Sequence, residues 1–426
     1  MHSNCPLQHI VRLDLFVFSV VPITIALICL YSRYRWSKKP VVIVASLPEI
    51  VALLTPPESV DMREALKAHA IPNLPLVRAF GITNTFSTDD PDVHRAFSRE
   101  ARSVLSSAVP NDADWDAFAQ VASETVNRYI LELHRPSRSD FTTFSRVITF
   151  RIVAVILFKV DPSLLRHEDV DYVTRGINEL WALSTTTTTF RPGLLDGINV
   201  HLKRWIPQYS NPIDFVLPTY ETMWRLIATS LAILHKDVVS RQTLADFLDN
   251  PLRRHFITYP AQSASVESIM KEILRIYPPT RGIFRAVQEP LLSFLPPPLS
   301  QFFTRTIVRA AEIGYLQRDK TIWGPDADVF DPMRHHPKRC TEMQQRSMLG
   351  FGFSSLKCVA SNWAPHAAAI MVAAILERVG EDVQIVEGPR IGGREGWDGW
   401  RVVSVNCQSE WMRSDEKAQE CHNPKR

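Results

Sequence analysis

The stretch "FGFSSLKCVA", residues 351–360, places an aromatic ring, small residues and a lysine ahead of one cysteine, Cys358. A long apolar run, "CVASNWAPHAAAIMVAAILERV", follows directly and predicts a helix that starts near this cysteine. The first amide groups of a helix lack internal partners and carry partial positive charge, which stabilises a thiolate. The pattern leaves two interpretations of Cys358: a buried structural cysteine or a metal ligand.

The composition is that of a globular protein with many irregular connections. Of the 426 residues, 45% are hydrophobic, and the net charge of +3 gives no indication of nucleic-acid binding. The 30 prolines outnumber the 15 glycines, which predicts abrupt helix ends. The six cysteines are scattered without a CxxC pair, so neither a disulfide scaffold nor a zinc cluster is favoured.

The N-terminal segment predicts a membrane anchor. Residues 15–31, "LFVFSVVPITIALICLY", carry no charge and reach the short end of membrane-spanning length. No small-residue cleavage site follows, and the four basic residues within 33–39 outnumber Arg12 on the other side, which predicts that the rest of the chain stays in the cytosol. We therefore expect a signal anchor with its basic flank at 1–39 and one folded domain at 40–426. A buried hydrophobic hairpin is the alternative.

The folded domain is expected to be mainly α with small β-sheets. Apolar residues recur at helical spacing, and Asp114 and Asp140 stand where helix caps are expected. A strand is expected at 41–45, and helices are expected at 47–55, 90–108, 114–134, 140–158, 170–184, 213–235 and 242–249. Residues 289–303 carry four prolines and predict an irregular segment, on the surface or against the membrane.

Three charged residues stand in an ordered series before Cys358. Glu272 and Arg275 lie three apart in "SIMKEILRIYPPTR", on one helix face, a spacing that alone is common by chance. Arg334 ends "FDPMR", amid turn-forming residues, 24 residues before Cys358. An arginine placed by a turn can join such a pair in a buried network of bidentate contacts. The order E-x-x-R, F-D-P-x-R and F-G-x-x-x-x-x-C is what makes the pattern specific.

This order of motifs resembles the cytochrome P450 family of haem-thiolate monooxygenases, of fungal microsomal type. The resemblance covers roughly residues 90–380 and is most specific in the final third. It implies the cytochrome P450 fold and a buried network of Glu272, Arg275 and Arg334. It also implies that Cys358 ligates the iron of haem b (heme, iron protoporphyrin IX) and that Phe351 lies against the sulfur. A thiolate in that position favours cleavage of the O–O bond.

Two residues depart from the family pattern near the cysteine. Ser354 stands where the family usually has glycine, and it would strain the turn if its φ were positive. Leu356 stands where the family usually has an arginine or histidine that holds a haem propionate. Lys357 is the neighbouring candidate for that contact.

The resemblance also implies roles for residues earlier in the chain. In "PTYETMWRLIATSLAIL", Glu221 and Thr222 fall in the register of the family's acid–alcohol pair, in which the alcohol holds a hydrogen bond at the dioxygen site and the acid relays protons. An ordinary helix start capped by Thr219 is the alternative. His94 and Arg285 fall at the family's propionate-binding positions. An arginine-rich face beside His94 can equally be a solvated surface or a reductase docking patch.

The implied activity is that of a haem-dependent monooxygenase. It would oxidise a small lipophilic substrate with O2 and electrons from NADPH, delivered by a membrane reductase, in secondary metabolite biosynthesis. The implied location is the endoplasmic reticulum membrane, single-pass, with a cytosolic catalytic domain that is somewhat shortened on its N-terminal side. A haem-thiolate isomerase or dehydratase and a catalytically inactive membrane-bound scaffold are the alternatives. No motif in the sequence identifies the substrate.

Overall fold

The structure, a computed structural model, describes residues 41–405 except 57–59, 134–138, 187–191, 261–262, 291–295 and 297–303. The expected signal anchor and its basic flank at 1–39 lie outside the described residues. So does most of the proline-rich part of 289–303, although the strand before it extends to Pro290.

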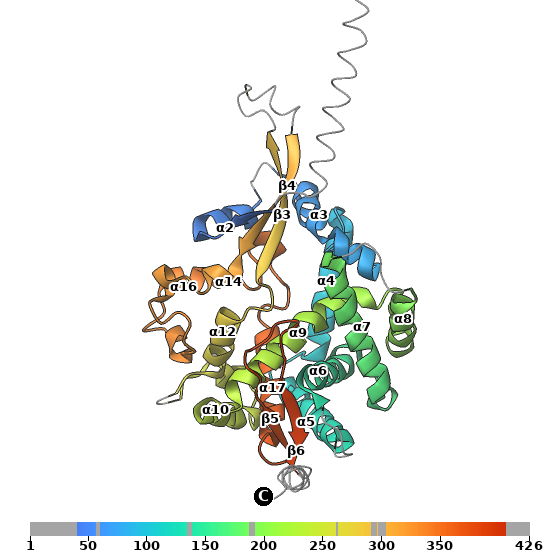
Figure 1. The fold of residues 1–426 in the computed structure, drawn as a ribbon, viewed down its shortest axis with the longest axis vertical. Coiled ribbons are helices and arrows are strands. Elements are labelled where there is room, and N and C mark those ends of the chain that lie inside the picture. The colour runs from blue at the N-terminus through green and yellow to red at the C-terminus, as the bar shows by residue number, and fades with distance from the viewer. Residues whose placement is uncertain are drawn as a thin grey trace, which may run out of the picture. The chain divides into compact units, whose positions relative to one another are not determined.

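The described chain is mainly helical with small sheets, as expected (Figure 1). Its helices are α2 (Leu47–Leu54), α3 (Met62–Phe80), α4 (Pro91–Ala108), α5 (Asp114–Leu133), α6 (Phe141–Phe158), α7 (His167–Thr186), α8 (Leu194–Trp205), α9 (Ile213–Leu234), α10 (Val238–Leu248), α11 (Arg253–Ile257), α12 (Val266–Ile276), α14 (Ile313–Leu316), α15 (Lys320–Trp323), α16 (Glu342–Arg346) and α17 (Ala364–Arg378). Three short 3-10 turns are η1 (Pro162–Leu164), η2 (Pro332–His335) and η3 (Ser354–Leu356). The strands are β1 (Val41–Val44), β2 (Ser139–Asp140), β3 (Gly282–Pro290), β4 (Thr304–Glu312), β5 (Val383–Val386) and β6 (Arg401–Ser404).

The strands form two three-stranded sheets, ordered β1-β4-β3 and β2-β6-β5. In the second sheet β5 and β6 are antiparallel, with Val383 opposite Ser404. The chain divides into two compact units. The described part of the first is residues 41–43 with the outer portions of β3 and β4, and there Glu289 pairs with Arg309 at 2.9 Å. The second unit holds the helices and the candidate site.

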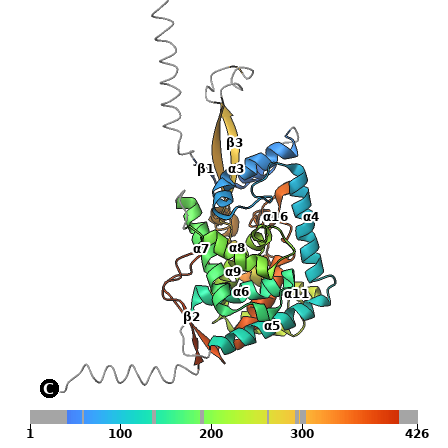
Figure 2. The same cartoon turned by 90° about the vertical axis from the view of Figure 1, so that its right-hand side faces the viewer.

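The core of the second unit is built around α6. This helix packs against α5, α7 and α9, and α17 packs against α5, α9 and α10. Figures 1 and 2 show α6 and α9 side by side. Within the described part of the chain, α6 is the one helix long and apolar enough to cross a membrane, with mean hydropathy 1.7, yet 83% of it is buried. Its apolar surface is therefore used for packing within the protein.

Of the two expected capping residues, Asp114 lies inside the first turn of α5, where its carboxylate accepts from the Asn111 N–H at 2.7 Å, so the expected cap is wrong there. Asp140 accepts a hydrogen bond from the backbone N–H of Thr143 at 2.9 Å and begins α6. The helix expected at 213–235 is α9, and because it begins at Ile213, Thr219 lies inside it. The hydroxyl of Thr219 bonds the carbonyl of Phe215 at 2.8 Å, so the alternative of a helix start capped by Thr219 is wrong.

The helix expected to start near Cys358 begins six residues later, at Ala364. Residues 359–363 form turns, and Pro365 occupies the first turn of α17. Proline is favoured there because its missing N–H would have no partner in a first turn, and its φ already suits a helix. Cys358 is therefore not in the first turn of a helix, and the expected stabilisation of its thiolate by a helix N-terminus does not apply.

Candidate functional site

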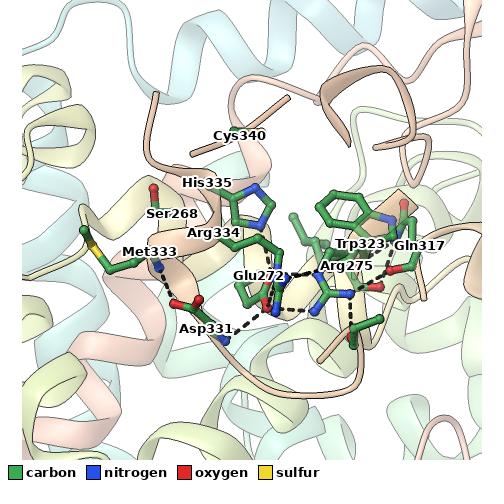
Figure 3. Close-up of polar contacts among 12 residues, drawn as sticks. Ser268, Glu272, Arg275, Gln317, Trp323, Asp331, Met333, Arg334, His335 and Cys340 are labelled. Atoms are coloured by element: carbon green, nitrogen blue, oxygen red, sulfur yellow. Dashed lines mark hydrogen bonds and ion pairs between the residues drawn. The ribbon is translucent and has the colours of Figure 1, made fainter. Parts of the chain in front are cut away.

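A buried ion pair on α12 forms the centre of the site. Glu272 and Arg275 are both 0% exposed. Arg275 donates from Nε and Nη2 to the two carboxylate oxygens of Glu272, at 2.7 and 2.8 Å (Figure 3). Its Nη1 donates to the carbonyls of Gln317 at 2.8 Å and Ala327 at 2.7 Å. The charge is thus matched and the guanidinium donors are occupied, as a buried pair requires.

The turn η2 brings Arg334 and His335 to the same carboxylate. Arg334 Nε lies 3.6 Å from Glu272 Oε1, while its shorter contacts go to the Asp326 carboxylate (3.0 Å) and the Trp323 carbonyl (2.8 Å). His335 Nε2 lies 2.9 Å from Glu272 Oε2. The structure thus brings together the three residues expected to form a network. It adds His335, which sequence reasoning missed, although it directly follows Arg334.

The network keeps Glu272 ionised. Desolvation raises the pKa of its carboxyl group, but hydrogen bonds from Arg275 and His335, together with their charges, outweigh that effect and lower the pKa to about 2. The carboxylate therefore keeps its charge throughout the neutral range, and the network depends on that charge.

Gln317 connects the network to the cysteine loop. Its side chain is buried, donates to the carbonyl of Arg275 at 3.1 Å and accepts from the backbone N–H of Leu349 at 3.2 Å. The carbonyl of Leu349 in turn accepts from Gly352 at 2.9 Å. Sequence reasoning missed Gln317, because its contacts are to backbone groups of distant segments. The loop that begins at Phe351 is thereby fixed to α12.

The cysteine loop closes on itself. The backbone N–H of Cys358 donates to the carbonyl of Phe351 at 2.8 Å, and the side chain of Phe351 packs against the main hydrophobic core. Gly352 has φ +78° and Ser354 has φ +59°, both in the left-handed region. Ser354 is strained there, since this region costs an L-residue about 1–2 kcal/mol. Cys358 itself is exposed at the end of this closed loop.

The surroundings of the Cys358 thiol include groups that raise its pKa and groups that lower it. Desolvation raises the pKa of Cys358, and this effect exceeds the stabilisation from the Ala360 backbone N–H and the charge of Lys357. The net shift is upward, opposite to the expectation from a helix start. A metal ion is a far stronger local charge than these groups and removes the proton of a thiol that it binds.

Arg285 on β3 is a buried cation without a carboxylate partner among the described residues. It is 8% exposed, and its guanidinium contacts the carbonyl of the adjacent Phe284 at 2.9 Å. Desolvation lowers its pKa to about 10. Buried charges in proteins are normally paired, so an anionic group of a ligand fits this position.

His94 on α4 is held by a neighbouring hydroxyl. Its Nδ1 lies 2.6 Å from Thr85 Oγ1. Desolvation, followed by the charges of Arg102 and Arg95, lowers its pKa, so the imidazole is neutral near pH 7. A neutral imidazole with one nitrogen occupied by Thr85 keeps the other for a ligand.

The expected acid–alcohol pair on α9 is not brought together. Glu221 is 2% exposed and lies in ion pairs with Arg394 (2.5 Å) and Arg225 (3.2 Å), whereas the adjacent Thr222 is exposed. Two guanidinium groups therefore compensate the charge of the buried Glu221 carboxylate. Desolvation lowers the pKa of Arg225 to about 10, even though Glu221 opposes the shift.

Comparison with known proteins locates the sequence similarity around this site. Residues 264–379 match the family model for cytochrome P450. The chain is 33% identical over 116 residues to cytochrome P450 72A397 from Kalopanax septemlobus, covering 26% of this chain and 21% of that protein. It is 31% identical over 121 residues to secologanin synthase 1 from Catharanthus roseus, covering 28% and 22%. The match to rat cytochrome P450 4B1 is 27% over 109 residues, covering 26% and 20%. The matched stretch thus spans about a fifth of each relative's length.

Solved structures match over most of the chain. A 6-coordinated cytochrome P450 from Thermus thermophilus has a TM-score of 0.56 at 15% identity, covering 86% of this chain and 92% of that one. A second, the cytochrome P450 CYP102L1, has a TM-score of 0.57 at 16% identity, covering 85% and 92%. At this identity the comparison establishes the fold.

Removing Glu272 should destabilise the protein far more than removing a partly exposed acid from the same helix. Glu272→Ala leaves Arg275 buried without its partner, which costs about 3–5 kcal/mol. Glu267→Ala breaks a half-exposed ion pair with Lys271 (3.0 Å) and should cost under about 1 kcal/mol. Urea unfolding followed by circular dichroism measures both. Equal costs for the two variants would contradict a buried network.

The buried pair of Glu272 and Arg275 should make the free energy of unfolding depend on pH. The pKa of Glu272 is depressed from 4.5 to about 2, so the stability it contributes is present above 4.5 and is lost as the pH falls towards 2. In Glu272→Gln, the decrease in unfolding free energy between pH 4.5 and 2 that Glu272 causes should disappear. This variant also replaces Glu272→Ala if the alanine variant does not fold.

Replacing Ser354 with glycine should stabilise the protein. Glycine has no Cβ to clash at φ +59°, so Ser354→Gly should gain about 1 kcal/mol. The neighbouring Ser355 lies outside the left-handed region, and Ser355→Gly should lose about 0.5–1 kcal/mol through chain entropy. The opposite signs of the two changes in unfolding free energy are the test, and a loss in both variants would show that Ser354 is not strained.

Proposed function

We propose that this chain is a haem-dependent monooxygenase of the cytochrome P450 family, which oxidises a small lipophilic substrate with O2. The match of residues 264–379 to the family model and the fold shared with solved cytochromes P450 support the proposal. The observation that carries the proposal is the exposed Cys358 at the end of a closed loop, which Gln317 fixes to the buried network on α12. A structural cysteine would instead be expected to lie within the core.

The described residues fit haem. Cys358 would bind the haem iron through its sulfur, and Phe351, at the start of the same loop, would lie beside the cysteine. Arg285, a buried cation without a carboxylate partner in the described chain, suits a propionate, and His94 offers a second contact. When bound, haem with a thiolate ligand supplies the activation of O2 and the oxidation chemistry.

The residues around Cys358 would hold the negative charge of the ligand. The Ala360 N–H donates to the sulfur and Lys357 adds a positive charge, although desolvation still leaves the pKa of the free thiol raised. The cysteine would therefore lose its proton when the metal binds.

On α9, Thr222 would hold a water molecule or a proton at its Oγ1 in the active site. Its side chain is exposed, so the hydroxyl is free to rotate between partners. Glu221 would instead fix the packing between α9 and the segment that carries Arg394, through the 2.5 Å ion pair. Arg394 also lies over the ring of Trp181 on α7, at 4.4 Å.

Electrons would come from NADPH through a membrane reductase, and residues 15–31 would anchor the protein to the endoplasmic reticulum in a single pass, as in fungal microsomal members. A role in secondary metabolism is supported by the similarity to a plant protein named secologanin synthase 1. One observation favours a second candidate, a haem-thiolate isomerase or dehydratase. The acid beside Thr222 is held in ion pairs, and only oxygen activation requires it to relay protons.

The spectrum of the carbon-monoxide complex tests the ligand. The purified, reduced protein loaded with haem should show the shifted Soret band of a thiolate complex, and Cys358→Ser should lose it. Cys340→Ser, at the other free cysteine of the described chain, is the matched control and should retain the band. A wild-type protein with no shifted band, or a band that survives in Cys358→Ser, would refute the assignment.

The ratio of product formed to NADPH consumed tests the proposed role of the Thr222 hydroxyl. Thr222→Ala should keep the haem spectrum and the spectral change induced by a lipophilic compound. Product per NADPH should fall at least several-fold while peroxide rises, because the proton donor is no longer ordered. Thr222→Ser retains the hydroxyl and should recover most of the coupling. Unchanged coupling in Thr222→Ala would exclude this role, and turnover without any reductase would identify the isomerase or dehydratase.

A further inference from the structure

A third basic side chain lies beside the two expected propionate ligands. His69 on α3 has its Nδ1 buried and without a hydrogen-bond partner in the described part of the chain. A buried polar atom without a partner is unfavourable, so a hydrogen-bonding group of a ligand would suit this position.

Packing places His69 close to His94. The ring of His69 lies 6.3 Å from the ring of Phe86, measured between centroids. The preceding residue, Thr85, contacts His94 at 2.6 Å. The two imidazoles therefore border the same short segment, one from α3 and the other from α4, and these two helices contact each other.

The electrostatics of His69 indicate an anionic partner. Desolvation is the main cause that lowers its pKa, to about 3, and the basic groups Arg285 and His94 lower it further. His69 is therefore neutral near pH 7 and carries one N–H to donate. Three basic groups that include a buried arginine form a site suited to a carboxylate.

We infer that His69 donates a hydrogen bond to a haem propionate and so supplies a contact that Leu356 cannot make. The inference rests on the proposed function, since it requires haem at Cys358. Lys357, the sequence-based candidate for this contact, is exposed on the cysteine loop. His69 is instead fixed within α3 and borders the segment that holds His94.

Loss of haem to an excess of apomyoglobin measures this contact directly. For the ferric protein, His69→Leu should release haem on the order of tenfold faster, as expected for a lost hydrogen bond to a charged group. His69→Gln keeps a donor and should fall between wild type and His69→Leu. His255→Leu is the control: its Nδ1 lies 2.9 Å from the carbonyl of Asn250, and its rate should match wild type.

Two further comparisons distinguish a propionate contact from a packing effect. Haem dimethyl ester has no free carboxylates, so the difference between wild type and His69→Leu should nearly vanish with it. Adding Leu356→Arg to His69→Leu restores a basic residue at the family's position and should slow haem loss again.

Each outcome decides between the alternatives. Equal rates of haem loss for wild type and His69→Leu would overturn the inference, while a thiolate spectrum would leave the proposed function standing. Faster haem loss in Lys357→Ala alone would assign the contact to Lys357. An undiminished difference with haem dimethyl ester would show that His69 acts through packing alone. A wild-type protein that forms no thiolate-haem complex would overturn the proposed function and this inference together. If His69→Leu does not fold, His69→Gln with the two haems gives the same decision.

Discussion

A carboxylate removed entirely from water must have its charge matched, and Glu272 meets this requirement through Arg275 and His335. Arg275 then uses its remaining donors on the carbonyls of Gln317 and Ala327, so the segments after β4 are fixed to α12. The side chain of Gln317 accepts a hydrogen bond from the backbone of Leu349, just before the cysteine loop, and so fixes the start of that loop. The position of Cys358 therefore depends on an ion pair far from it in sequence.

The loop that presents the cysteine is strained at one residue and does not favour the thiolate by itself. Ser354 occupies the left-handed region, and the thiol has a raised pKa because desolvation exceeds the help from Ala360 and Lys357. Strained or destabilised groups persist where surrounding structure holds them in place and are concentrated at functional sites. A metal ion would supply the positive charge that a thiolate at this position needs.

Sequence reasoning succeeded where short-range geometry determines the outcome. The three-residue spacing puts Glu272 and Arg275 on one helix face, and the cap and apolar periodicity after Asp140 place α6. It failed for Gln317 and His335, whose partners are set by packing between separate segments. It also did not predict the ion pair between Glu221 and Arg394, because nothing local to α9 indicates that contact. The start of α17 was misplaced because apolar residues continue through the turns before Ala364, although Pro365 was a readable signal.

If this scaffold presents Cys358 to iron, X-ray absorption at the iron edge of the haem-loaded protein should detect the sulfur. We expect one sulfur ligand in the first coordination shell of the wild-type iron and none in Cys358→Ser, with the four haem nitrogens present in both. An iron shell of nitrogen and oxygen alone in the wild-type protein would contradict it.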